Sequence, residues 1–106
     1  MDTCLFCKII GGEIPSTKHY EDTDVVVIAD IHPAAPVHLL VMPKKHIIDI
    51  IEADEVMLGK LLTVVKKLIS EKKIINHRIV VNGKGAQFVE HLHIHVMGGV
   101  SKDRVL

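Results

Sequence analysis

The sequence predicts an α+β domain built on an antiparallel sheet. Three observations indicate this class: several short runs rich in β-branched residues, turn residues between those runs, and one long segment of helical period. A chain of 106 residues is long enough for one hydrophobic core but not for two. We therefore expect a single domain over residues 1–106.

The N-terminal half contains a short helix or turn followed by three strands. Residues Thr3–Ile10 end at Gly11-Gly12, where glycine stops a helix. Asp22-Thr23-Asp24 predicts a hairpin, and the prolines at 33 and 36 bound the next crossing. The three strands, which we expect to be antiparallel neighbours, are Lys18–Glu21, Asp24–Asp30 and His38–Met42.

The C-terminal half begins with the one long helix. Asp54 can cap its first turn, and its apolar residues recur at helical spacing. Gly59 costs this helix about 1 kcal/mol relative to alanine unless something packs closely there. Arg78–Asn82 and His91–Met97 are predicted as the last two strands, joined by a glycine-rich loop. The expected buried face of the helix is Met57, Leu61, Val64, Val65 and Leu68.

Composition excludes several classes of partner. Thirteen basic residues balance thirteen acidic ones, and aromatic residues make up 3% of the chain, so a nucleic-acid polymer is not expected as a partner. No apolar stretch approaches the roughly 18 residues of a membrane span, and the N-terminus does not resemble a signal peptide. We expect a cytoplasmic protein that does not bind a membrane.

The most informative motif is the alternating segment His91-Leu92-His93-Ile94-His95-Val96. In a strand its three imidazoles share one face, and the aliphatic residues lie on the other. Imidazoles at this spacing are about 7 Å apart along the face, so convergence of all three on one metal ion is awkward. A neutral imidazole is a good nucleophile toward phosphorus, and the adduct is labile to water. The motif therefore favours phosphoryl or nucleotidyl transfer.

This segment, followed by Gly98-Gly99, resembles the signature of the histidine triad (HIT) family, and the ending is similar to the Hint branch. The resemblance implies a five-stranded antiparallel sheet with one long and one or two short helices, extended across a homodimer. It covers nearly the whole chain through shorter matches, which are Cys4-Leu-Phe-Cys-Lys-Ile-Ile, Glu13-Ile-Pro, Tyr20-Glu-Asp, Asp30-Ile, Ala35-Pro, Pro43-Lys-Lys-His and Val81-Asn.

The resemblance also implies roles for individual residues. His93 would be the nucleophile that takes the nucleotidyl group, His95 would bind the phosphate, and His38 would orient the triad. Asp30 would accept hydrogen bonds from the ribose of a purine nucleotide or nucleoside phosphoramidate. The other implied nucleotide-binding residues are Phe6, Ile9, Ile28, Ile31, Asn82 and Gln87. By themselves, the four apolar residues of this set would more often belong to the core, whereas Asn82-Gly83 is equally consistent with a simple turn.

Cys4 and Cys7 have the spacing of half a zinc site, and in a reducing compartment such a pair is more often a metal or redox device than a disulfide. Two reduced, buried cysteines are the alternative. The resemblance implies that His46 and His91 complete a closed Cys₂His₂ site for a structural zinc ion, with no organic cofactor.

One departure from the family pattern concerns Phe88, which follows Gln87 where the family commonly has a small hydroxyl residue. Phe88 cannot make a hydrogen bond to a leaving group. The sequence thus leaves three interpretations: a nucleotide hydrolase or nucleotidyl transferase acting on phosphoramidates or related conjugates, a purine-nucleotide-binding regulator or scaffold with little turnover, and a metal-storage protein or metalloenzyme.

Overall fold

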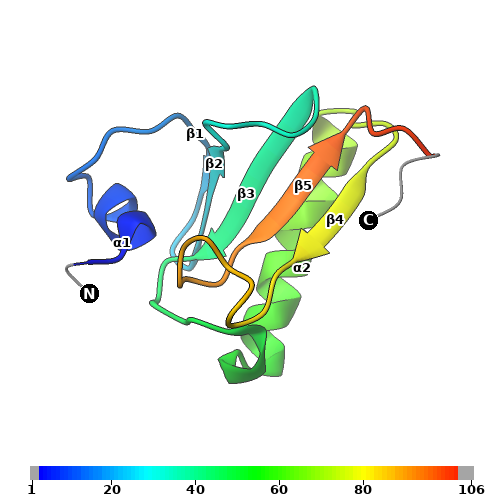
Figure 1. Ribbon diagram of the computed structural model, residues 1–106. Helices are drawn as coiled ribbons and strands as arrows, with labels where there is room; N and C mark the ends of the chain where they lie inside the picture. Colours follow the sequence, from blue (N-terminus) through cyan, green and yellow to red (C-terminus); the bar gives the residue numbers. More distant parts are fainter. Residues whose placement is uncertain (1–2, 103–106) are drawn as a thin grey trace.

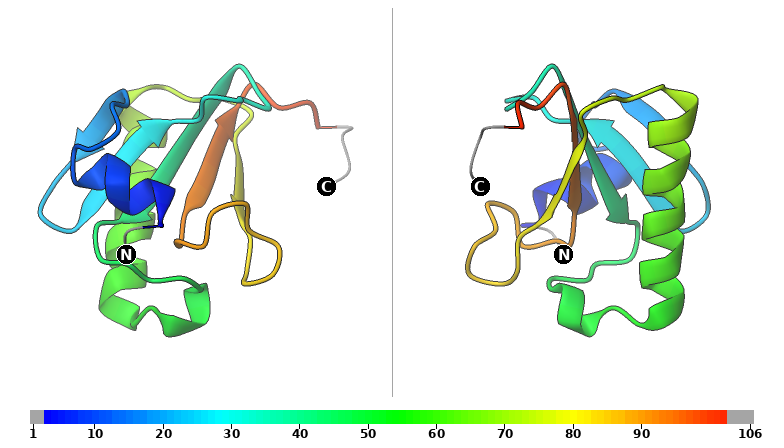
Figure 2. Two further views of the ribbon diagram at one scale, coloured as in Figure 1. Left: turned by 60° about the vertical axis from the view of Figure 1, so that its left-hand side comes forward. Right: turned by 90° about the vertical axis from the view of Figure 1, so that its right-hand side faces the viewer.

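The computed structural model describes residues 3–102, which form a five-stranded antiparallel sheet between two helices of unequal length (Figure 1). The long helix α2 lies along one face of the sheet, and the short helix α1 covers part of the other (Figure 2). Within this range no helix has the length and apolar character needed to cross a membrane. The predicted α+β class is confirmed.

The strand order is β1-β2-β3-β5-β4, and every neighbouring pair is antiparallel. β3 therefore lies at the centre, while β1 and β4 form the edges. The expectation that the first three strands are neighbours is confirmed. The elements in chain order are α1 (Leu5–Ile10), β1 (Lys18–Glu21), β2 (Val25–Ala29), β3 (Val37–Pro43), the 3₁₀ turn η1 (Ile50–Glu52), α2 (Glu55–Glu71), β4 (Arg78–Val81) and β5 (Ile94–Gly98).

Side-chain alternation in the central strands divides the interior into two cores. In β2, Val25 and Val27 face α2, whereas Val26 and Ile28 face α1. All four are buried because both faces of this part of the sheet are covered. This explains why β2 reads as a continuous apolar run rather than an alternating one.

Helix α2 follows the sequence prediction at its N-terminus and on its buried face. Asp54 caps it by accepting a hydrogen bond from Met57 N–H at 2.8 Å. The buried residues are Leu61, Val64, Val65 and Leu68, and Met57 packs against them. A Cβ added at Gly59 would meet nothing within 4 Å, so nothing in the described part of this chain packs closely there.

The bounds predicted for the last strand were wrong. β5 begins at Ile94 rather than at residue 91, because its pairing with β3 stops at Val41↔Ile94. The backbone just before it bonds to loops instead: Leu92 N–H donates to Ile47 O at 2.6 Å, and His91 N–H donates to Val89 O at 2.8 Å. His91 and His93 thus lie in an irregular segment that leads into β5.

Candidate active site and metal site

The three imidazoles of the motif still share the α1 face of the sheet. The ring centroid of Phe6 lies 5.0 Å from that of His93, which in turn lies 5.0 Å from that of His95. Leu92 and Ile94 pack in the opposite core against α2. The backbone of residues 91–96 remains extended, so its side chains still alternate between the two faces of the sheet. The predicted separation of histidines from aliphatic residues therefore holds, although β5 begins only at Ile94.

The hydrogen bond made by His93 defines which of its nitrogens can react. Its Nδ1 lies 2.7 Å from the backbone carbonyl oxygen of His91, which can only accept, so Nδ1 carries the hydrogen. In the neutral ring, Nε2 then has a free lone pair. Burial lowers the pKa of His93 below its usual value, which favours this neutral form. His93 therefore presents an unprotonated nitrogen at neutral pH.

His38 and His95 are linked by a chain of hydrogen bonds that begins at the backbone. Ala34 N–H donates to His38 Nδ1 at 3.0 Å, so the hydrogen of neutral His38 is on Nε2. That Nε2–H points at His95 Nδ1, 2.9 Å away, and His95 must accept it. His95 consequently carries its own hydrogen on Nε2 and is a donor there. Burial, with smaller contributions from His93 and His38, lowers the pKa of His95 to about 4.

Asp30 lies beside this pair at the end of β2. Its Oδ1 accepts a hydrogen bond from His32 N–H at 2.8 Å, and its Oδ2 is 3.4 Å from His38 Nε2. The ligating atoms of Asp30, His38 and His95 come within 4.8 Å of one another. A metal ion bound here would need a lone pair on His38 Nε2. Because Ala34 N–H donates to Nδ1 of that ring, the hydrogen of neutral His38 is on Nε2, and no lone pair is available there. The arrangement suits hydrogen bonding rather than metal binding.

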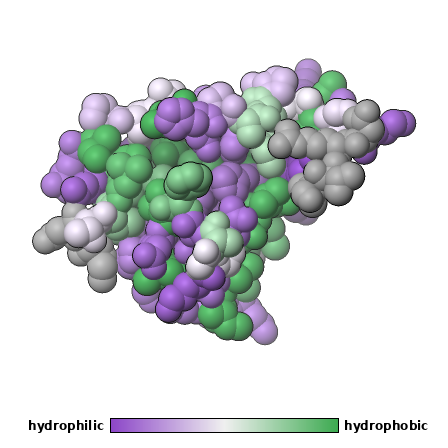
Figure 3. Space-filling view, in the orientation of Figure 1, coloured by the Kyte–Doolittle hydropathy of each residue, from purple (hydrophilic) through white to green (hydrophobic). Residues whose placement is uncertain are grey.

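Apolar side chains gather between α1 and the strands beside it (Figure 3). Phe6, Ile9 and Ile28 are buried in the core on that side of the sheet. Ile31 differs, because 83% of its surface is exposed. Of the four residues expected to form a base pocket, three are therefore buried in this core and one is exposed.

The glycine-rich loop places Asn82 directly after β4, and Gln87 ties the loop to the opposite chain segment. Gln87 Nε2–H donates to Ile48 O at 2.7 Å, while Gln87 Oε1 is buried without a hydrogen-bond partner among residues 3–102. Sequence reasoning identified neither this tie nor the Ala34 N–H bond to His38. Backbone donors and acceptors carry no residue-type signal, although Pro33 and Pro36 did mark the Ala34 segment as a fixed turn.

The second cluster contains the donor atoms of Cys4, Cys7, His46 and His91, all within 4.8 Å of one another. Cys4 caps α1, and its Sγ accepts from Cys7 N–H at 3.4 Å, so the start of the helix brings both sulfurs together. His91 Nε2–H donates to Pro43 O at 2.8 Å, which leaves the Nδ1 lone pair facing the sulfurs. The four residues form a group that can hold a metal ion.

The separations in this cluster match tetrahedral coordination. Bonds of about 2.3 Å to sulfur and about 2.0 Å to nitrogen place two tetrahedral donor atoms about 3.5 Å apart. The observed sulfur-to-Nδ1 distances are 3.2 Å from Cys7 to His46, 3.5 Å from Cys4 to His91 and 3.6 Å from Cys7 to His91. Burial, followed by the neighbouring Cys4 thiol, raises the pKa of Cys7 to about 11. A cation would reverse that shift and stabilise the thiolate.

A buried histidine with an unprotonated nitrogen, a histidine N–H donor beside it and a separate Cys₂His₂ group all lie on one face of a five-stranded sheet. This arrangement fits a histidine-dependent nucleotide-binding protein or hydrolase. A family model described as scavenger mRNA decapping enzyme C-term binding matches residues 3–105. The Neisseria gonorrhoeae protein HitA is 41% identical over 104 residues, covering 92% of this chain and 97% of HitA. An uncharacterized HIT-like protein of Synechococcus elongatus is 42% identical over 103 residues, covering 92% and 90%.

Solved structures agree with these relatives. A HIT family hydrolase from Clostridium thermocellum is 41% identical, covers 100% of this chain and 98% of its own, and superimposes with a TM-score of 0.90. A zinc-bound histidine triad family protein from Mycobacterium smegmatis is 28% identical, covers 99% and 81%, and has a TM-score of 0.86. The chain belongs to the histidine triad family.

Proposed function

We propose that this protein cleaves nucleoside phosphoramidates or related nucleotide conjugates through a covalent nucleotidyl-histidine intermediate. The observation that supports this most directly is the His93 ring, whose Nδ1–H is bound to a backbone carbonyl and whose Nε2 lone pair is free. Such a ring is held in one orientation with its nucleophilic nitrogen unprotonated. Burial of the ring also lowers its pKa, which favours the unprotonated form.

In the first step His93 Nε2 attacks the α-phosphorus, and the bond from phosphorus to the leaving nitrogen breaks. The amine departs with the bonding electron pair and takes up a proton. In the second step water attacks the same phosphorus, the bond to Nε2 breaks, and a nucleoside monophosphate is released. Negative charge on the phosphoryl oxygens is met by His95 Nε2–H, which His38 orients. Asn82 and Gln87 lie on the loop proposed to close over the phosphate.

The nucleoside is proposed to bind between α1 and the end of β2. Phe6, Ile9 and Ile28 supply an apolar wall for a purine base, and Ile31 is exposed at the rim. Asp30 is the acceptor for the ribose hydroxyls, since His32 N–H and His38 fix its carboxylate without neutralising it. This arrangement would place the α-phosphorus near His93.

We also propose that zinc occupies the Cys4, Cys7, His46 and His91 group as a structural ion. Two thiolates and two imidazoles are ligands typical of zinc, and four protein ligands leave no open position for catalysis. The ion would hold the N-terminal segment and α1 against the residues that precede β5. Thiols that bind a metal must stay reduced, so the proposed location is the cytoplasm.

The active form is proposed to be a homodimer. β4 is an edge strand of the sheet, and Ile79 on it remains 37% exposed on the side of α2. Helix α2 carries two exposed apolar residues, Val56 and Leu62, with Gly59 between them at helical spacing. A second copy that pairs β4 with β4 would cover these residues and continue the sheet.

The experiment is a steady-state assay with adenosine and guanosine phosphoramidates, comparing the wild type with His93→Ala. His77→Ala serves as the matched control, because His77 is exposed and lies outside both clusters. Turnover that persists in His77→Ala and disappears in His93→Ala, at equal zinc content, supports the proposal. Rapid quenching at alkaline pH followed by intact-protein mass spectrometry should detect the nucleotidyl adduct only when His93 is present.

The regulator interpretation draws on Phe88, whose side chain is fully exposed and offers no hydrogen bond to a leaving group. If the wild type binds nucleoside monophosphate but turns over neither substrate, this interpretation replaces the hydrolase. Phe88→Ser then provides a second comparison. Turnover gained by that variant would locate the defect at residue 88.

A further inference from the structure

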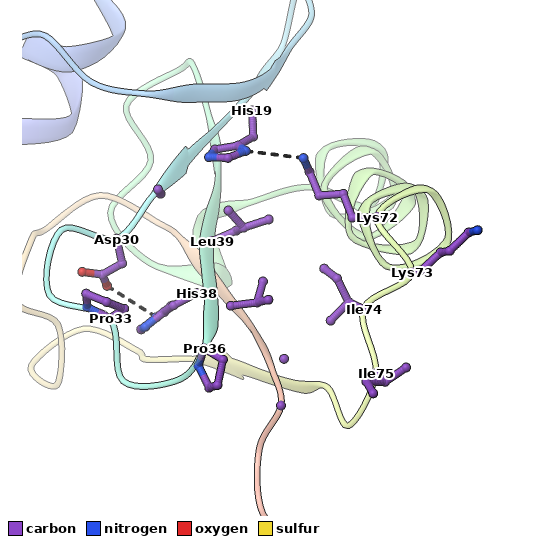
Figure 4. A pocket seen from close by; sticks show the side chains of 14 residues that line it. His19, Asp30, Pro33, Pro36, His38, Leu39, Lys72, Lys73, Ile74 and Ile75 are labelled. Atoms are coloured by element: carbon purple, nitrogen blue, oxygen red, sulfur yellow. Dashed lines mark hydrogen bonds and ion pairs between the residues drawn. The ribbon is translucent and has the colours of Figure 1, made fainter.

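A pocket lies largely on the α2 side of the sheet, and at one edge its lining reaches Asp30 and His38 of the proposed nucleotide site. Its volume is about 610 Å³, and it opens where β2 ends and β3 begins, beneath the turn that follows α2 (Figure 4). Leu39 and Ile74 face each other across it, and Ala29 and Val37 add further apolar surface. This volume falls within the range of small-molecule sites, and apart from Asp30 and His38 the proposed function uses none of the lining residues.

One end of the pocket carries two basic side chains side by side. Lys72 Nζ donates to His19 Nδ1 at 3.4 Å, so neutral His19 keeps a hydrogen on Nε2, and the ammonium keeps two further hydrogens. Within residues 3–102 the structure gives Lys72 no carboxylate partner. Other surface lysines differ: Lys44 pairs with Glu21 at 2.7 Å.

The one carboxylate along the pocket does not neutralise this basic end. Asp30 contributes to the lining, but its oxygens face His32 N–H and His38 on the other side of the strand (Figure 4). Lys72 and His19 therefore lie side by side at the end of an apolar pocket, and each has an N–H donor that is not used in their mutual hydrogen bond. An anionic group bound there would accept charge-assisted hydrogen bonds.

The far wall is fixed by hydrogen bonds rather than being a loose loop. Ile74 N–H donates to Ile69 O at 3.0 Å, which closes the helix through Lys73 in a left-handed conformation with φ +52°. Gly99 N–H donates to Ile75 O at 2.9 Å and ties the turn to the end of β5. A Cβ at Gly98 would lie 2.5 Å from Ile74 Cγ2, so glycine is what lets Ile74 approach the sheet. The cavity is therefore already formed without a ligand.

We propose that this pocket binds a small carboxylate with an apolar body, such as a medium-chain aliphatic acid. The apolar part would lie between Leu39 and Ile74, and the carboxylate would reach Lys72 and His19 at the solvent-exposed end. The residues that would hold this ligand, Leu39, Ile74, Lys72 and His19, are not part of the proposed nucleotide site, although the pocket borders that site at Asp30 and His38. A cationic molecule of the same shape should be rejected, because its head group would meet the ammonium of Lys72 and the Nε2–H of His19.

The test is a titration of the folded wild-type protein with sodium octanoate, followed by amide chemical shifts in ¹H–¹⁵N NMR spectra. Saturable shifts should appear at Val37, Ile74 and Gly99. Octylamine, which has the same chain and the opposite charge, should give none at these positions. Equal shifts with octylamine, or octanoate shifts confined to the α1 face, would overturn the proposal.

Two sets of variants distinguish binding at Lys72 and His19 from a general effect of removing positive charge. Lys72→Gln combined with His19→Gln should weaken octanoate binding roughly tenfold, the effect of losing a charge-assisted contact. Lys66→Gln is the matched control, since Lys66 is an exposed α2 lysine outside the pocket lining, and it should bind as the wild type does. Octanoate binding that is insensitive to the double variant would contradict the proposal, provided that both variants give folded spectra.

Discussion

His38 donates its Nε2 hydrogen to Nδ1 of His95 across 2.9 Å, and the backbone N–H of Ala34 determines that direction. A backbone group in a turn thereby sets the hydrogen position on an imidazole two steps away. The same logic holds for His93, whose Nδ1–H is bound to the carbonyl of His91. The two neighbouring rings consequently offer different groups to a ligand: His93 offers a nitrogen lone pair, and His95 offers an N–H donor.

Replacing His38 should test this chain of hydrogen bonds. In His38→Phe, His95 Nδ1 loses its donor, so His95 is free to place its hydrogen on either nitrogen. We expect kcat for phosphoramidate hydrolysis to fall about 100-fold, in the range found when a proton-positioning group is lost. His32→Phe is the control, because the His32 side chain is exposed and only its backbone N–H bonds to Asp30. A His38→Phe enzyme with unchanged kcat would show that His95 needs no partner.

Acid should destabilise the fold through His95. Its folded-state pKa of about 4 lies below the unfolded value of about 6.5, so the unfolded chain binds more protons between these limits. The free energy of unfolding is therefore unaffected above about pH 6.5 and should decrease as the pH falls toward 4. Urea midpoints at pH 7.5 and 5.0 measure this loss. His95→Gln should show a smaller pH dependence than the wild type, and identical slopes would exclude His95 as the source.

Metal removal should destabilise the protein if zinc occupies the Cys₂His₂ group. His46→Gln removes one ligand, whereas His77→Gln changes an exposed histidine outside the cluster. We expect the first variant to purify with less than one zinc per chain and a lower Tm, and the second to match the wild type. Elemental analysis and thermal unfolding measure the two properties. Full zinc occupancy in His46→Gln would rule out His46 as a ligand.

Gly59 offers a test of the proposed dimer. A Cβ at this position meets nothing within 4 Å in the described chain, so Gly59→Ala should stabilise α2 by up to about 1 kcal/mol in a monomer. If a partner helix packs between Val56 and Leu62, the added methyl group should instead weaken the dimer. We expect weaker association by sedimentation at several protein concentrations, with Ser70→Ala as the control on an exposed α2 position. Unchanged association would place the interface away from Gly59.

The elements were largely predictable because their signals are local. The cap at Asp54 and the run of valines in β2 each fixed an element to within about a residue. The start of β5 was not predictable, since it depends on where β3 stops pairing and on a bond from Leu92 to the carbonyl of Ile47. Alternation of side chains survives in irregular extended backbone, so sequence alone predicted the face of the histidines but not the strand boundary.

The metal-site residues and the basic pair show the same contrast between local signals, which the sequence reveals, and tertiary contacts, which it does not. The spacing of Cys4 and Cys7 indicated a metal or redox device from the sequence, whereas His46 is brought in by the tertiary fold and was reached only through the family resemblance. The basic pair His19 and Lys72 had no sequence signal, because the residues are 53 positions apart and belong to different elements. Contacts of that kind become visible only when the helix is docked on the sheet.

His91 belongs to both clusters through different atoms. Its ring faces the cysteine sulfurs and the carbonyl of Pro43, while its own carbonyl holds the Nδ1–H of His93. A change of its side chain would therefore confound coordination with chemistry, and no kinetic result from such a variant could be attributed to one of them. A design that changes the proposed reaction but not the proposed metal site, or the reverse, should therefore keep His91 and vary other residues.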